Sequence, residues 1–184
     1  MSWQTSALSN ATPVPWRNGG GITRELATYP RTGPWQWRIS VADVASNGPF
    51  SRFEGVHRWF AVLSGAGVLL DVGGVVHRLG PTDGAINFSG QTPVDCQLMG
   101  GSTLDFNLMC HGCTADLHRV REPHALTVST QTTVGVFALS ASSLGCNDRV
   151  VPLPAQTLAW HLPDTDCVWQ LHTTHALVFQ ITVD

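Results

Sequence analysis

Residues 19–21 are three consecutive glycines, and they restrict the local backbone more than any other feature of the sequence. Glycine loses more conformational freedom on folding than other residues, so a triplet indicates left-handed backbone or a close approach to another group. The Pro-Val-Pro sequence at 13–15 fixes φ at two positions, and Trp16 and Arg17 follow it. Because polar residues flank the glycines on both sides, we predict that this stretch borders a ligand.

The glycines also fit other interpretations, some of which the sequence excludes. A wide turn between strands has the same composition and stays open as the simpler alternative. A phosphate-binding loop would end in Gly-Lys-Ser or Gly-Lys-Thr, and a dinucleotide-binding loop would read Gly-x-Gly-x-x-Gly; neither pattern occurs here. Arg24 and Glu25, close to Arg17, favour a polar pocket that binds a carboxylate or an amide through charge-assisted hydrogen bonds.

The composition argues against several classes of partner. Hydrophobic residues make up 43% of the 184 residues, charged residues only 12%, and the formal net charge is −3. This charge offers no basic surface to a nucleic acid, and no lysine-rich run would bind an anionic membrane. We expect no membrane-spanning run and no signal peptide. Five cysteines, an odd number without compact spacing, indicate reduced thiols in a cytoplasmic protein.

Short strands separated by glycine and proline predict an all-β fold. Residues 35–42 alternate apolar and polar side chains, which places Trp35, Trp37, Ile39 and Val41 on one buried face. Further strands are expected at 22–29, 58–63, 68–71, 75–79, 85–88, 94–99, 104–109, 114–120, 132–139, 156–160, 168–172 and 177–183. A short helix is expected near 138–144. The pattern predicts a sandwich or barrel, in two similar β halves with a seam near 119–126.

The histidines do not form a recognisable metal motif. Eight histidines occur, but none belongs to a His-x-His pair that would point two rings the same way from one strand. The segment Cys110-His111-x-Cys113 lacks a second ligand pair at a fixed spacing. No Gly-x-Ser-x-Gly nucleophile motif occurs either. We therefore expect no metal, no cofactor and no serine nucleophile.

Two strands carry polar residues that favour a binding site. Arg58 begins a strand among aromatic side chains, and in 104–109 the side chains of Asp105, Asn107 and Met109 share one face. The simpler alternatives are an arginine at the rim that stacks on tryptophan, and a solvated outer face of a sheet.

Four segments resemble the HutD/Ves family of bacterial cupin-like proteins. They are 15–26 with its Trp-Arg-Asn-Gly-Gly-Gly motif, 35–42 (WQWRISVA), 48–67 (from GPFSRFEGVHR to LSGAG) and 105–109 (DFNLM). Together they cover about residues 13–110 in the order of the family. Beyond about residue 120 only the length and the β character match. The sequence departs from the commoner family pattern at His57, where Asp or Asn is usual, and at His111, where Arg is usual.

The resemblance implies a cupin-like double barrel, a bicupin, with two barrels packed in one cytoplasmic chain. It links the protein to histidine utilisation or, in the Ves branch, to stress. It implies that a small pathway metabolite such as formylglutamate or urocanate binds and limits the activity of the pathway. The metal ligands of ordinary cupins are missing here.

We expect a small anionic or amide-bearing metabolite to be the partner, bound by Trp16, Arg17, Asn18, Gly19, Gly20, Gly21, Thr23, Glu25, His57, Arg58, Asp105 and Asn107. Trp16 would form a wall, and Asn18 and the glycine backbone would supply hydrogen bonds. Arg58 would bind a ligand carboxylate, while Asp105 and Asn107 would receive the polar end. An interior arginine is costly unless paired, so Asp105 would pair with Arg58 in the empty site.

Other classes of function stay open. The protein could be a hydrolase or isomerase with Glu25 or Asp105 as general base, or a structural or partner-binding barrel, and a homodimer is one option. A raised carboxyl pKa beside a closed cavity would favour the enzyme. An open polar pocket with both carboxylates paired to arginine would favour the binding protein.

Overall fold

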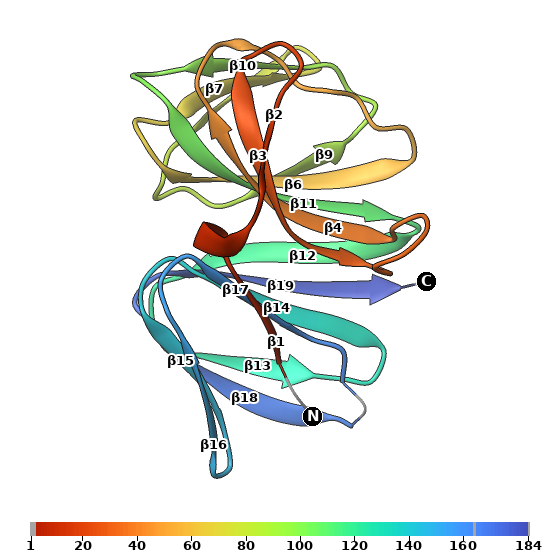
Figure 1. Cartoon of the computed structure of the whole chain (residues 1–184), viewed down its shortest axis with the longest axis vertical. Helices are drawn as coiled ribbons and strands as arrows, with labels where there is room; N and C mark the ends of the chain where they lie inside the picture. The colour runs from red at the N-terminus through yellow and green to blue at the C-terminus, as the bar shows by residue number, and fades with distance from the viewer. Residues whose placement is uncertain (1–2, 164, 184) are drawn as a thin grey trace. The chain divides into compact units, whose positions relative to one another are not determined.

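The computed structural model describes residues 3–163 and 165–183, and apart from one short 3-10 turn at Leu8–Asn10 its regular elements are strands (Figure 1). The chain divides into two compact units. The first unit is Thr12–Gly112, and the second combines Met1–Ala11 with Cys113–Asp184. The chain therefore passes between units at Gly112, earlier than the seam expected near 119–126. Gly112 has a φ of +64°, which suits a turn between consecutive strands.

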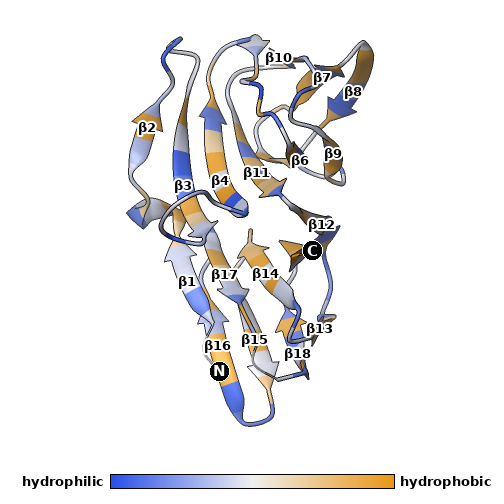
Figure 2. Cartoon of the chain, turned by 90° about the vertical axis from the view of Figure 1, so that its right-hand side faces the viewer, coloured by the Kyte–Doolittle hydropathy of each residue, from blue (hydrophilic) through white to orange (hydrophobic). Residues whose placement is uncertain are grey.

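The first unit consists of two antiparallel sheets. The larger sheet has the order β2-β3-β4-β11-β6-β9. Its strands are β2 (Pro13–Pro15), β3 (Gly21–Tyr29), β4 (Trp37–Val44), β11 (Thr103–His111), β6 (Val56–Ser64) and β9 (Ile86–Ser89). The smaller sheet has the order β5-β10-β7-β8, with β5 (Gly48–Pro49), β10 (Val94–Leu98), β7 (Val68–Val72) and β8 (Val75–Leu79). In Figure 2, β4 is mostly hydrophobic, whereas β3 carries a strongly hydrophilic band.

The second unit repeats this topology. One sheet has the order β1-β17-β14-β19-β12, with β1 (Gln4–Ala7), β17 (Thr157–His161), β14 (Thr132–Ala138), β19 (Ala176–Val183) and β12 (Cys113–Val120). The other has the order β13-β18-β15-β16, with β13 (His124–Val128), β18 (Cys167–His172), β15 (Ser142–Cys146) and β16 (Arg149–Leu153). The order β4-β11-β6-β9 of the first unit thus corresponds to β12-β19-β14-β17, and β5-β10-β7-β8 corresponds to β13-β18-β15-β16.

Each unit has its own hydrophobic core between its two sheets. In the first unit, Phe60 and Val62 of the larger sheet pack in one cluster with Leu70 and Cys96 of the smaller sheet. In the second unit, the cluster joins Val136 and Val178 of one sheet to Leu126, Leu144 and Trp169 of the other. Burying apolar surface of both sheets in this way is the main driving force for packing them.

The strands expected from alternation are present, and the all-β class is confirmed. Trp37, Ile39 and Val41 are completely buried, as the pattern of 35–42 predicts, but Trp35 precedes β4 and is only half-buried. The helix expected near 138–144 is wrong, because β14 ends at Ala138 and β15 begins at Ser142. Strand β15 pairs with both β16 and β18, so tertiary pairing overrides the local preference of this Ala- and Leu-containing stretch. No helix in the described part of the chain is long and apolar enough to cross a membrane.

Substitution of Gly135 tests the packing of the second unit. Gly135 lies opposite Phe179 in the β14–β19 pair, and a β-carbon there would overlap the phenyl ring of Phe179, which is fully buried. Gly135→Ala should therefore lower the free energy of unfolding by about 1–3 kcal/mol through overpacking. Gly145→Ala is the matched control, because its β-carbon would meet nothing nearer than 4.0 Å. Urea unfolding that shows equal effects of the two substitutions would contradict this account.

Candidate functional site

The candidate site lies on the inner face of the larger sheet of the first unit. One row across β4, β11 and β6 consists of Arg38, Met109 and Arg58, and the next row consists of Ser40, Asn107 and Phe60. Directly paired residues of antiparallel strands point to the same face, so these side chains all project to one side. The strand periodicity of two explains why Arg38 and Ser40, and Asn107 and Met109, share this face.

These side chains border a cavity of about 510 Å³. The rest of its lining comes from β2, from the segment that carries the glycines, and from the aromatic segment around Phe50 and Phe53. Three arginines, Arg17, Arg38 and Arg58, contribute to the lining, and none of the described residues that line it carries a carboxylate. The cavity therefore combines apolar walls with an excess of positive charge.

Arg58 is buried, with 5% of its surface exposed. One terminal nitrogen donates to Asn107 Oδ1 at 2.8 Å, and the other donates weakly to the carbonyl oxygen of Ser51 at 3.4 Å. Its Nε is buried without a hydrogen-bond partner. The guanidinium carbon lies 5.4, 5.7 and 5.3 Å from the ring centroids of Phe50, Phe53 and Phe88. Cation–π attraction from three rings thus supports a cation that no carboxylate of the described residues neutralises.

Burial is the main influence on the charge of Arg58. Burial and, to a smaller extent, the positive charge of Arg38 together lower the pKa of the guanidinium from 12.5 to about 10. Arg58 is therefore still charged at neutral pH. A buried charge that lacks an opposite charge is costly, and the cost falls when an anion enters the site.

The predicted pair between Arg58 and Asp105 is wrong. Asp105 is fully buried, its Oδ2 accepts a hydrogen bond from Thr103 Oγ1 at 2.9 Å, and its Oδ1 has no partner. Asp105 is paired with Val62 in the β11–β6 ladder, two rows from Arg58, and it does not line the cavity. Burial raises its pKa from 3.8 to about 7; the hydrogen bond from Thr103 opposes this rise, and the charge of Asp43 adds to it.

The glycine-rich segment shapes one wall of the cavity. Gly19 has a φ of +71°, and a β-carbon on Gly21 would lie 2.5 Å from the carbonyl oxygen of Asp43 and 3.2 Å from the indole of Trp16. Both left-handed backbone and close approach therefore occur within the triplet. The Trp16 amide donates to the Gly21 carbonyl at 2.9 Å, and its indole Nε1 donates to Thr23 Oγ1 at 2.7 Å. These bonds hold the indole against the cavity.

The polar ends of this segment have separate roles. Asn18 Oδ1 accepts a hydrogen bond from the Gly20 amide at 3.0 Å, so its side chain closes the turn while it also borders the cavity. The Gly20 carbonyl accepts from the amides of Ala45 and Ser46 at 2.9 and 3.3 Å. The backbone of the triplet is thus largely engaged within the protein.

Not all the expected residues come together. Trp16, Arg17, Asn18, Thr23, Arg58 and Asn107 line the cavity. Glu25 lies in a neighbouring recess, where its Oε2 accepts a hydrogen bond from Arg38 Nε at 2.7 Å. His57 is exposed, on the face of β6 opposite to Arg58, so its assignment to the site is wrong. The assignment of Asp105 to the site is also wrong, because Asp105 does not line the cavity. Gly19, Gly20 and Gly21 shape the wall without bordering the cavity themselves.

Further residues line the cavity that the sequence pattern does not single out, among them Arg38, Ser40, Phe50, Phe53 and Phe60. Arg38 and Ser40 alternate with the buried face of β4, which makes them look like solvent-facing residues. Only the pairing of β4 with β11 shows that this second face borders an interior. The aromatic run after Gly48 was a visible signal, because apolar side chains in a loop need a surface to cover.

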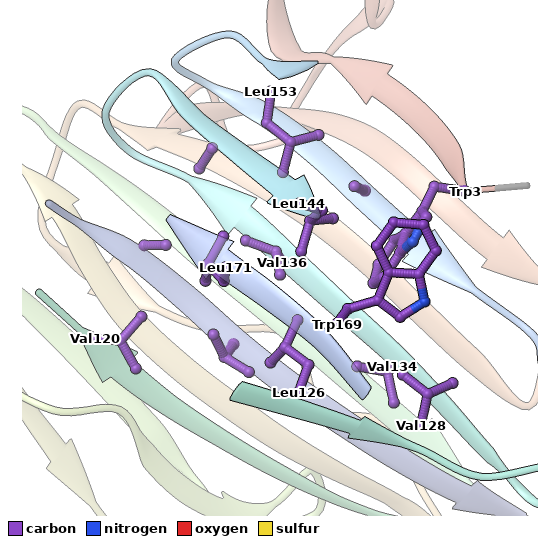
Figure 3. Packing of buried hydrophobic residues seen from close by; sticks show 14 residues of the cluster. Trp3, Val120, Leu126, Val128, Val134, Val136, Leu144, Leu153, Trp169 and Leu171 are labelled. Atoms are coloured by element: carbon purple, nitrogen blue, oxygen red, sulfur yellow. The ribbon is translucent and has the colours of Figure 1, made fainter. Parts of the chain in front are cut away.

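The inner face of the second unit is largely apolar among the described residues, with Thr157 and His161 as buried polar exceptions on β17. Its β14–β19 pair corresponds to β6–β11, and the inward residues Val136, Ala138, Ala176 and Val178 are apolar and buried. Trp3 and Trp169 lie edge to face with ring centroids 5.6 Å apart (Figure 3). Large side chains thus fill this interior. Among residues 3–163 and 165–183, no group of three or more His, Cys, Asp or Glu side chains converges in a way that could hold a metal ion.

The sequence matches the HutD family over residues 8–182. A relative from Pseudomonas putida, an uncharacterised 21.2 kDa protein in the hutC 3′ region, is 44% identical over 99 residues, which is 52% of each chain, so the match spans about half the relative's length. Protein Ves from Cronobacter sakazakii is 33% identical over 79% of this chain and 80% of the relative.

Solved structures agree with this assignment. HutD from Pseudomonas fluorescens SBW25 is 26% identical, covers 98% of both chains and superposes with a TM-score of 0.87. An oxalate decarboxylase from Bacillus subtilis is only 10% identical, covers 98% of this chain and 76% of its own, and reaches a TM-score of 0.64. This more distant similarity concerns the fold alone, and it shows that the fold is cupin-like.

Substitution of Gly21 tests the wall of the cavity. Gly21→Ala places a methyl group against the Asp43 carbonyl and the Trp16 indole, so it should lower the free energy of unfolding by about 1–3 kcal/mol. Gly84→Ala is the control, since nothing lies within 4 Å of its β-carbon. Urea unfolding measures both. If the Gly21→Ala protein is as stable as the control, the triplet is only a turn and does not need close packing.

The buried carboxyl of Asp105 predicts a specific pH dependence of stability. Its pKa is higher in the folded protein, at about 7, than the ordinary 3.8, so the folded state binds more protons between these values. Stability should therefore fall as the pH rises from about 4 to 7, by on the order of 3 kcal/mol from this group. Asp105→Asn should remove most of that fall, whereas Asp95→Asn, at an exposed position of β10, should not. Urea unfolding at pH 4, 6 and 8 measures this dependence. If stability changes with pH in the same way in the wild type and in Asp105→Asn, the raised pKa of Asp105 is wrong.

Proposed function

The chain belongs to the HutD family, and we propose that it binds a small carboxylate-bearing metabolite in the cavity of its first unit. The observation that carries this proposal is Arg58, a guanidinium 5% exposed that faces the cavity without a carboxylate partner among the described residues. A ligand carboxylate would supply the missing negative charge. Charge-assisted hydrogen bonds of this kind are about twice as strong as neutral ones.

The remaining donors of Arg58 determine how the carboxylate would bind. Asn107 already holds one terminal nitrogen at 2.8 Å, which fixes the plane of the guanidinium. The Nε has no partner, and the second terminal nitrogen has only the long contact to Ser51. The second terminal nitrogen therefore keeps donor capacity for one oxygen of a carboxylate, whereas the Nε–H lies on the side of the terminal nitrogen that Asn107 holds and is buried.

The apolar walls would receive the rest of the metabolite. Trp16 and Phe50 lie nearly perpendicular with ring centroids 6.4 Å apart, and Phe60 lies 5.7 Å from Phe50. All three side chains line the cavity. Small-molecule sites commonly combine such aromatic walls with a few placed polar groups. A planar or short aliphatic acid suits this lining.

The names of relatives suggest the pathway. One relative lies in the hutC 3′ region and a solved relative is named HutD, and the family resemblance links these proteins to histidine utilisation. Formylglutamate and urocanate, both carboxylates, are therefore the metabolites we propose. Binding would report the level of the metabolite and limit the activity of the pathway.

The positions of Asp105 and Glu25 favour a binding function over hydrolysis or isomerisation. A general base must reach the proton that it removes. Asp105 has a raised pKa but does not line the cavity, and Glu25 is engaged by Arg38 in the neighbouring recess. Neither carboxylate is therefore free inside the cavity.

Calorimetric titration of formylglutamate, urocanate and glutamate tests the proposal. At least one of these acids should bind the wild-type protein below millimolar concentration. Arg58→Met should weaken that binding by about 1.5–3 kcal/mol, the range for a hydrogen bond to a charged group. Arg78→Met, at an exposed position of β8 outside the cavity lining, is the matched control and should bind like the wild type.

Two results would contradict the proposal. One is that none of the three acids binds the wild-type protein at millimolar concentration. The other is that Arg58→Met, with a melting temperature near that of the control, binds as tightly as Arg78→Met.

A further inference from the structure

A second arginine stands in the same row of the sheet as Arg58. Arg38 and Arg58 both pair with Met109, one from β4 and the other from β6, so the two arginines are two strands apart on one face. This spacing separates their α-carbons by about 10 Å. Both side chains line the cavity, and the charge of Arg38 contributes to the lowered pKa of Arg58. The two guanidinium groups therefore act on the same enclosed space.

The two arginines are held in matching ways by partners of different charge. Arg58 donates to Asn107 in the next row, at 2.8 Å, and Arg38 donates through Nε to Glu25, at 2.7 Å. Glu25 is paired with Ser40, so it also belongs to the row of Asn107. An amide leaves the charge of Arg58 in place, whereas the carboxylate of Glu25 neutralises Arg38.

The pair of Arg38 and Glu25 is open to exchange. Their side chains are 23% and 48% exposed, so the attraction between them is screened by water and is weak compared with that of a buried pair. Only Nε of Arg38 is engaged, and its two terminal nitrogens have no hydrogen-bond partner among the described residues. Arg38 borders both the cavity and the recess of about 500 Å³ that contains Glu25. It can therefore contact a ligand in the cavity.

We propose that Arg38 is a second anion-binding group whose resident counter-ion is Glu25, so that the site selects ligands with two acidic groups over ligands with one. The inference rests on the proposed binding of a carboxylate at Arg58. The first acidic group neutralises Arg58, and the second takes the free terminal nitrogens of Arg38. Glu25 limits the gain, because its own negative charge lies beside the second acidic group and competes for Arg38.

Glutarate and pentanoate form a matched pair of probes, because they have the same number of carbons and differ in one carboxylate. Calorimetric titration at pH 8 and low salt keeps both acids fully ionised and the charges unscreened. The wild-type protein should bind glutarate at least about tenfold more tightly than pentanoate. Arg38→Met should reduce this preference below about threefold, because glutarate loses more affinity than pentanoate does. Arg78→Met should keep the wild-type preference.

Glu25→Gln gives an independent test that does not remove a cationic group. Without the competing carboxylate, the affinity for glutarate should rise several-fold, and it should rise more than the affinity for pentanoate. Melting temperatures of all variants show that each is folded.

The outcomes separate this inference from the proposed function. If pentanoate binds and Arg58→Met abolishes its binding, but the preference for glutarate is absent or survives Arg38→Met, the inference about Arg38 is wrong and the proposed function stands. A loss of glutarate preference in Glu25→Gln would also overturn it. If neither probe acid binds the wild-type protein although formylglutamate, urocanate or glutamate does, the inference about Arg38 is wrong and the proposed function stands; if none of the five acids binds, both statements are wrong.

Discussion

The charge on Arg58 is the constraint on which the candidate site depends. Taking a guanidinium out of water costs several kcal/mol unless other groups replace its hydration. Here the replacement is partial, since three phenylalanine rings face the cation, one amide oxygen accepts at 2.8 Å and Nε has no partner. A protein that needed only stability would place a carboxylate or an apolar residue there. The incomplete pairing is what gives the cavity its preference for an anion.

The surrounding fold places the charge of Arg58 at the border of the cavity. Arg58 lies on β6, between β11 and β9 of a six-stranded sheet, whose inner face continues into a hydrophobic core around Phe60 and Val62. The glycine-rich segment brings Trp16 against that face because Gly21 has no β-carbon to collide with the indole. In the second unit the same topology encloses Trp3, Trp169 and aliphatic side chains instead. One topology thus supports a polar cavity in one half and a largely apolar core in the other.

Much of the fold could be predicted from the sequence, because strand alternation and glycine or proline turns are local signals. The strand at 35–42 and its buried residues Trp37, Ile39 and Val41 were found in this way. The chemistry of the site was less accessible. Arg58 and Asn107 were found from residue type and alternation, but their partners depend on register across β11, which pairs residues about fifty positions apart.

The wrong assignments to the site, and the residue that was missed, also result from strand pairing that the sequence does not show. Asp105 shares a face with Asn107, yet it lies one row farther from Arg58, and sequence alternation cannot show that distance. His57 was assigned to the site from its position in the family motif. In the structure it is exposed, on the face of β6 opposite to Arg58. Arg38 was missed because it alternates with the buried residues of β4, so the sequence places it on a solvent-facing side of the strand. Only the neighbouring strands show that this side also borders an interior. Prediction of long-range pairing is therefore the step that limits prediction of the site.

The most direct test of the account is a crystal structure of the protein grown with 3-bromopropionate, with bromine located by anomalous scattering. The account requires a bromine peak inside the cavity of the first unit, with the carboxylate against a terminal nitrogen of Arg58. A carboxylate bound only elsewhere, with Arg58 still without an anion at saturating acid, would contradict it.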